Sequence, residues 1–323
     1  MNIAINVENL VKIYKIGFWA KKVRVLDGIN FNVEKGSTFG LLGPNGAGKT
    51  TTLKTLVGLT RPSKGKVTVL GKLPTDIKNH KRVGYLPESP YIYNYLTGHE
   101  FLNFCGSLHG MQGKQLNIKI NEMMDLVSLE KSSAKKQLNT YSKGMLQRIG
   151  IAQALINDPE VVFLDEPMSG LDPIGRHEVK EIMKLLKKQN KTVFFNTHIL
   201  SDVEELCDKI AIMVKGKIVK QGIVSDLISP SDNLMYVRIA GLNTMGKTNV
   251  KRVSLKLQKT ELEDEVYAIF NDIDSAIKGM TIAKQSGGYV ISMTPHKISL
   301  EETFVKLVNE NSDRSVEAKK AEK

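Results

Sequence analysis

A glycine-rich loop at residues 43–50 has the composition and spacing of a phosphate-binding site. It reads Gly-Pro-Asn-Gly-Ala-Gly-Lys-Thr, after an apolar stretch and before a stretch with helical spacing. Glycines let backbone N–H groups converge on phosphate oxygens, and the start of a helix favours anions. Lys49 is expected to reach the β- and γ-phosphates, and the Thr50 hydroxyl to bind Mg²⁺. We therefore expect a nucleoside triphosphate to contact Gly43, Pro44, Asn45, Gly46, Ala47, Gly48, Lys49, Thr50 and Thr51.

Two adjacent carboxylates, Asp165 and Glu166, stand near the end of the apolar run 161–167. Such a short β-branched run is typical of a strand buried on both faces of a parallel sheet. A carboxylate there costs free energy unless a cation or a hydrogen-bond donor compensates it. With a phosphate-binding loop upstream, Mg²⁺ is the expected partner of Asp165. Glu166 points to the other side of the strand end, and we expect it to polarise the attacking water as general base.

His198 ends the next buried run, 191–198. This position is again the carboxyl edge of the sheet, where ligands of open α/β folds collect. A lone histidine is more often a packing residue, but this strand context favours a contact with the γ-phosphate. Lys49, Glu166 and His198 are therefore the candidate catalytic residues.

The elements around these residues alternate between strand and helix. An apolar strand and a helix flank the loop within 36–59, helical spacing covers 177–189, and a buried strand follows at 191–198. This alternation predicts βαβ units, hence an α/β fold with a parallel sheet. We expect it to occupy residues 1–227.

A cluster of Ser, Asp and Pro at 225–233 predicts a linker, and we expect a small α+β domain at 228–310. There we expect a strand near 253–257, a helix over 266–277, and two strands, 280–284 and 289–293, joined by a Ser-Gly-Gly turn. Ser299 and Glu302 would form the capping box of a last helix. Residues 311–323 are polar and predict a disordered tail.

Composition excludes several classes of protein. The 323 residues contain no run of 18 apolar side chains, which excludes a membrane-spanning helix, and the start lacks the pattern of a signal peptide. Two distant cysteines exclude a disulfide framework or a zinc cluster. The net charge is +12, of which residues 1–228 carry +11. Such an excess suggests a polyanionic partner.

Five motifs together resemble those of the ATP-binding cassette (ABC) ATPases. They are the phosphate-binding loop, Asp165-Glu166, the segment 169–172, His198, and the sequence Thr-Tyr-Ser-Lys-Gly-Met-Leu-Gln-Arg at 140–148, which is similar to that family's signature. The resemblance covers roughly residues 3–225. It implies a P-loop NTPase cassette with a helical subdomain.

The resemblance also implies roles for further residues. Tyr14 matches the aromatic that stacks on adenine. Ser142 and Gly144 match the signature residues that contact the γ-phosphate bound by the opposite subunit, and Asp172 matches the aspartate of the loop that crosses between the two sites. Because one cassette completes the site of another, a single P-loop per chain implies a dimer, either with itself or with a close paralogue.

Three features depart from the family's pattern: the signature, Glu88 and an insertion. Lys143 replaces a glycine of the signature and adds a cation near the phosphates, and Met145 replaces a glutamine. Glu88 stands where the family's glutamine would contact Mg²⁺ and signal to the membrane subunit. An insertion at 16–22 places Phe18 and Trp19 next to two lysines, either to meet lipid headgroups or to pack as a hairpin on its own sheet.

The resemblance therefore implies an ATPase subunit, with ATP and Mg²⁺, that energises a separate transmembrane permease from the cytoplasmic face of the membrane. Glu88, Lys143 and the segment 299–304 resemble the subgroup of drug-, sodium- and polysaccharide-type exporters, so export is favoured over import. An anionic membrane surface would suit the charge, and no nucleic acid is expected. The rival interpretations are a soluble ABC ATPase that acts on ribosomes or DNA, and a regulatory nucleotide-binding module.

Overall fold

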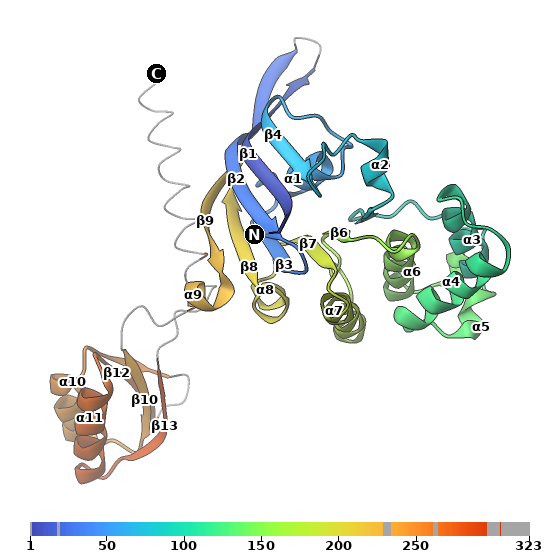
Figure 1. Cartoon of the computed structure of the whole chain (residues 1–323). Coiled ribbons are helices and arrows are strands. Elements are labelled where there is room, and N and C mark those ends of the chain that lie inside the picture. Colours follow the sequence, from blue (N-terminus) through green and yellow to red (C-terminus); the bar gives the residue numbers. More distant parts are fainter. Residues whose placement is uncertain (1, 18–19, 229–233, 261–263, 296–303, 305–323) are drawn as a thin grey trace. The chain divides into compact units, whose positions relative to one another are not determined.

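The computed structural model describes residues 2–17, 20–228, 234–260, 264–295 and residue 304 (Figure 1). These residues divide into two compact units, the first ending at Val224 and the second beginning at Ser225. In the described parts of the chain, no helix has the length and apolar character needed to cross a membrane.

A six-stranded sheet forms the centre of the first unit, in the order β5-β6-β7-β3-β8-β9. Its first five strands are parallel, and β9 pairs antiparallel with β8. The runs that predicted buried strands are β3, β6 and β7, and every residue in them is buried. The strands are β3 (Thr38–Leu42), β5 (Val83–Leu86), β6 (Val161–Asp165), β7 (Thr192–Thr197), β8 (Lys209–Val214) and β9 (Lys217–Ile223).

The helices of this α/β core begin where the sequence supplies a suitable first turn. Helix α1 (Lys49–Leu56) follows the glycine-rich loop, and α7 begins at Pro173. The Asp172 side chain caps α7 by accepting a hydrogen bond of 2.9 Å from the Gly175 N–H. The short helix α8 precedes β8 along the chain, and the short helix α9 follows β9, at the boundary of the two units. Their bounds are α7 (Pro173–Lys188), α8 (Leu200–Leu206) and α9 (Val224–Ile228).

A second, antiparallel sheet packs beside α1, in the order β2-β1-β4. It consists of β1 (Ile3–Ile16), β2 (Lys21–Glu34) and β4 (Lys64–Val69). The insertion at 16–22 lies at the tip of the β1–β2 hairpin, although Phe18 and Trp19 lie outside the described residues. Phe31 of β2 stacks on Phe39 of β3 at 5.4 Å between ring centroids, which joins this sheet to the core.

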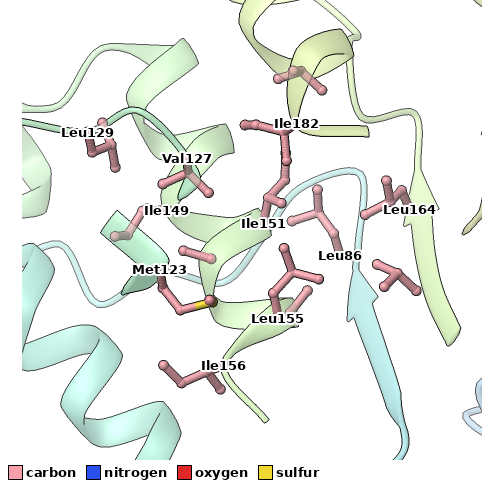
Figure 2. Close-up of a cluster of buried hydrophobic side chains, with 14 of the residues drawn as sticks. Leu86, Met123, Val127, Leu129, Ile149, Ile151, Leu155, Ile156, Leu164 and Ile182 are labelled. Carbon is pink, nitrogen blue, oxygen red and sulfur yellow. The ribbon is translucent and has the colours of Figure 1, made fainter. Parts of the chain in front are cut away.

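A helical subdomain occupies the segment between β5 and β6. Figure 2 shows how its last helix is fixed: Ile151 and Leu155 of α6 lie among Leu86 of β5, Leu164 of β6 and Ile182 of α7. Removing one such fully buried side chain costs about 2–5 kcal/mol. Helix α6, whose first turn carries the signature, is therefore held against the sheet through its second half. The helices of this segment are α3 (Gly98–Leu108), α4 (Gly113–Leu126), α5 (Lys131–Ala134), a 3₁₀ turn (Leu138–Thr140) and α6 (Lys143–Leu155), and the short helix α2 (Ile77–His80) precedes β5.

The second unit is an α+β sandwich of one antiparallel sheet, in the order β11-β12-β10-β13, with α10 and α11 on one face. Its core contains Val237, Ile239, Ala268 and Phe270 from the two central strands. The elements are β10 (Met235–Ala240), α10 (Thr244–Val253), β11 (Lys256–Lys259), β12 (Glu265–Phe270), α11 (Ile273–Gln285) and β13 (Tyr289–Pro295).

Several expectations for this unit were wrong in detail. The helix expected over 266–277 is strand β12 followed by the start of α11, and the strand expected at 280–284 belongs to α11. The buried residues of α11 are small, Ala276, Gly279 and Ala283, and the larger Met280 and Ile282 are only partly buried against the core, so few large apolar side chains mark this helix. The expected linker begins within helix α9. The expected capping box, and the tail at 311–323, lie outside the described residues.

Candidate nucleotide-binding site

The glycine-rich loop lies between β3 and α1, at the carboxyl edge of the six-stranded sheet. Gly48 has a φ of +110°, a backbone conformation that residues with a side chain rarely adopt. A Cβ added at Gly43 would lie 2.4 Å from the Met213 carbonyl oxygen, so only glycine fits there. A cavity of about 370 Å³ opens over the loop. Its lining residues are Val25, Asn45, Gly46, Ala47, Gly48, Lys49, Thr50, Thr51, Glu88, Glu166, Ser169 and His198.

Lys49 is buried at the base of this cavity. Its ammonium donates hydrogen bonds of 2.7 and 3.3 Å to the carbonyl oxygens of Gly43 and Pro44. It also lies 3.2 Å from Oε1 of Glu166. Gly43 and Pro44 do not line the cavity themselves. Their carbonyl oxygens hold the ammonium of Lys49, which does line it.

Asp165 is only 1% exposed, and its charge is poorly compensated. Its Oδ1 accepts hydrogen bonds from the Asn196 amide at 2.8 Å and from the Thr50 hydroxyl at 3.3 Å. Burial raises the pKa of this carboxyl, and the charges of Glu88 and Glu166 raise the pKa further. A buried carboxylate with neutral donors and two acidic neighbours is chemically suited to a divalent cation that also contacts the Thr50 hydroxyl.

Glu166 is aimed into the cavity by its backbone. Its φ is +49°, in the left-handed region, directly after the end of β6. Its Oε2 lies 2.9 Å from Nδ1 of His198, and its Oε1 faces Lys49. The carboxylate is thus held by a cation on one side and an imidazole on the other, with the His198 ring 43% exposed to the cavity. This arrangement can orient a proton acceptor toward a water molecule beside a terminal phosphate.

The signature residues lie outside this cavity. Ser142 caps α6, and its hydroxyl accepts a hydrogen bond of 3.2 Å from the Met145 N–H. Gly144 lies on the first turn of α6, near the first turn of α7 that Asp172 caps. The ammonium of Lys143 lies against Gly170, in the loop that leads to α7. These residues therefore form a second surface of the cassette, next to α7.

Tyr14 does not line the cavity. In the β1–β2 hairpin it pairs with Val23, two residues before the lining residue Val25, and a bulge in the pairing falls at Val25. The Lys12 ammonium lies 4.8 Å from the centre of the Tyr14 ring.

Three residues at the site were missed from the sequence. Asn196 is fully buried, and as a polar residue near the end of the apolar run 191–198 it could have been recognised by the reasoning applied to Asp165. Ser169 lines the cavity from the segment 169–172. Val25 carries no local signal, because only the pairing of the hairpin brings it over the loop.

The fold and the site define a P-loop nucleoside triphosphatase. Residues 26–169 match the model of a family described as ABC transporter. The uncharacterized ABC transporter ATP-binding protein sll0415 of Synechocystis is 45% identical over 93% of this chain and 83% of its own length. The Nod factor export ATP-binding protein I of Rhizobium is 31% identical over 90% of this chain and 94% of its own.

Among solved structures, a dimeric bacterial ABC transporter cassette, MJ0796, covers 68% of this chain and 98% of its own length, with 25% identity and a TM-score of 0.63. The chain belongs to the ABC transporter ATP-binding proteins. It is an ATP-binding ATPase subunit of a transporter, with the cassette fold expected from its motifs.

Proposed function

We propose that two cassettes, two copies of this chain or one with a close paralogue, close around two ATP molecules and reopen after hydrolysis. The observation that carries the proposal is the division of the predicted site residues. The phosphate-binding loop, Glu166 and His198 share one cavity, whereas Ser142, Gly144 and Asp172 lie on another surface. A cassette with both surfaces can supply one half of each of two sites in a symmetric dimer.

Within each site, the phosphate-binding loop and Lys49 hold the phosphates. Thr50 and Asp165, with Glu88 nearby, bind Mg²⁺, which would neutralise charge on the phosphate oxygens. Glu166 accepts the proton of the attacking water, while His198 orients Glu166 and contacts the γ-phosphate. Tyr14 stacks on adenine from the hairpin. Ser142 and Gly144 of the opposite cassette contact the γ-phosphate, and Asp172 lies at the crossing between the sites.

A membrane subunit is the proposed partner of the loop that follows Glu88. The tyrosines of this loop are highly exposed: Tyr91 is 99% and Tyr95 is 69% exposed. Tyr93 stands between Tyr95 and Phe104 of α3, at 5.9 and 5.7 Å between ring centroids. Exposed aromatic clusters of this kind favour protein interfaces. Because the loop begins at Glu88 in the nucleotide cavity, a partner docked there would respond to the state of the nucleotide.

Export is the proposed direction, supported by the similarity to a Nod factor export protein. The proposed location is the cytoplasmic face of the membrane, as a peripheral subunit. The charge excess of +11 in residues 1–228 supports a further contact with anionic lipid headgroups. That contact should weaken with salt, because exposed charges are screened.

Purification of the full chain from detergent-solubilised membranes tests the permease. We expect a protein with several membrane spans to copurify, and Tyr91→Ala with Tyr95→Ala to lose it. Leu59→Ala, which removes an apolar side chain that is 65% exposed elsewhere on the cassette, is the control and should retain it. Copurification of ribosomal RNA or DNA in place of a membrane protein would contradict the proposal.

A further inference from the structure

The sheet of the second unit has two edges of different chemistry. Strand β11 forms one edge and begins and ends with exposed lysines, Lys256 and Lys259. Charged side chains, lysine above all, are the usual means by which proteins prevent an edge strand from pairing with another chain. The β11 edge is therefore protected.

Among the residues that the structure describes, the opposite edge, β13, has no such protection. Its sequence, Tyr-Val-Ile-Ser-Met-Thr-Pro, contains no charged residue, and all seven residues are exposed. Tyr289 is 64% and Ile291 40% exposed. A one-residue shift in the pairing with β10, at Ile291, bends the strand but adds no charge. An exposed, uncharged and largely apolar edge strand is unfavourable in water and favours pairing through its free backbone edge.

We propose that β13 pairs antiparallel with β13 of a second copy of this chain, so that the two sheets of this unit become continuous. A two-fold axis brings the same residues together from both copies. The uncharged β13 meets itself without repulsion, whereas self-pairing of β11 would bring four lysines together. In a dimer of cassettes, moreover, two copies of this unit are tethered, which raises their effective concentration.

Sedimentation of the full chain without nucleotide tests the pairing separately from ATP binding and from any membrane partner. We expect a concentration-dependent dimer. Ser292 is the middle residue of β13 and pairs with Arg238, so its side chain lies on the sheet face that carries the Arg238–Glu265 ion pair. Ser292→Lys places like charges opposite each other at the two-fold axis and should raise the dimer Kd by about tenfold.

Gln258→Lys is the matched control, because it adds the same charge to β11 and should leave the Kd unchanged. Thermal melting checks that both variants fold, and Thr294→Lys replaces Ser292→Lys if the latter does not. Ser292→Cys should also form a disulfide-linked dimer under mild oxidation, whereas Gln258→Cys should not. A monomeric parent, or equal dimerisation of the two lysine variants, would overturn the proposal and leave β13 to an extended segment of another protein.

Discussion

Substitution of Asp165 tests whether this residue binds the metal ion. Its buried negative charge destabilises the protein when no cation is bound, and it is compensated only when a cation binds. Asp165→Asn keeps the shape of the side chain and retains an oxygen for the hydrogen bonds from Asn196 and Thr50. It removes a buried negative charge beside Glu88 and Glu166. We therefore expect the variant to be at least as stable as the parent when Mg²⁺ is absent.

The raised native pKa of Asp165 gives the direction of this effect. A pKa raised by one unit above the unfolded value would cost about 1.4 kcal/mol of folding free energy at neutral pH. Each kcal/mol that the variant gains would raise its Tm by about 2–4 °C for a domain of this size. The sign is specific: the penalty is present above the raised native pKa and disappears as the pH falls below 3.8, so the advantage of the variant should shrink with acid.

Calorimetry of parent and variant in EDTA, as a function of pH, measures this difference. With Mg²⁺ and ATP added, the parent should gain stability from the metal and the variant should gain much less. Hydrolysis by the variant should fall by orders of magnitude. A variant that melts well below the parent in EDTA, or that keeps the full stabilisation by Mg²⁺, would refute the assignment of Asp165 as a metal ligand.

Two further substitutions separate binding from hydrolysis. His198→Ala removes the imidazole 2.9 Å from Oε2 of Glu166 together with its proposed contact to the γ-phosphate, so kcat should fall by about 10²-fold while the Kd for ATP rises by a much smaller factor. An equal loss in both would assign His198 to nucleotide binding alone. Gly144→Ala adds a Cβ whose nearest neighbours lie 3.9 and 4.0 Å away, so chemical denaturation should show unchanged or slightly greater stability. Its ATPase activity should nevertheless fall, and retained activity would contradict the contact with the opposite nucleotide.

The phosphate-binding loop and the acidic pair were predictable because short contiguous segments determine them. A strand before residues 45–51 and a helix after them are enough to make these residues converge on one cavity. The end of β6 is likewise enough to place Glu166 at that cavity. Val25 and Tyr14 depend instead on how the β1–β2 hairpin pairs and where it lies. A single sequence does not specify such distant contacts.

The second unit was harder because two periodicities coexist in the same residues. Val266, Ile269 and Phe270 have helical spacing, yet Val266, Ala268 and Phe270 alternate as in a strand and all three are buried. The strand forms because β12 is central in the sheet, between β10 and β11. In α11, a Cβ added at Gly279 would lie 2.1 Å from the Phe270 ring, so close packing against β12 requires a glycine where a large apolar residue would have marked the helix.

The central claim, a hydrolytic site shared between two cassettes, is tested most directly by Glu166→Gln. This change keeps the side chain's size but removes the proposed proton acceptor, which lies 3.2 Å from the Lys49 ammonium. The variant is sedimented with Mg²⁺ and ATP in a chain that also carries Ser292→Lys, because that substitution weakens the proposed pairing through β13. Under these conditions it should form a dimer that retains two unhydrolysed ATP molecules. A monomer with bound ATP, or turnover equal to that of the parent, would contradict the account.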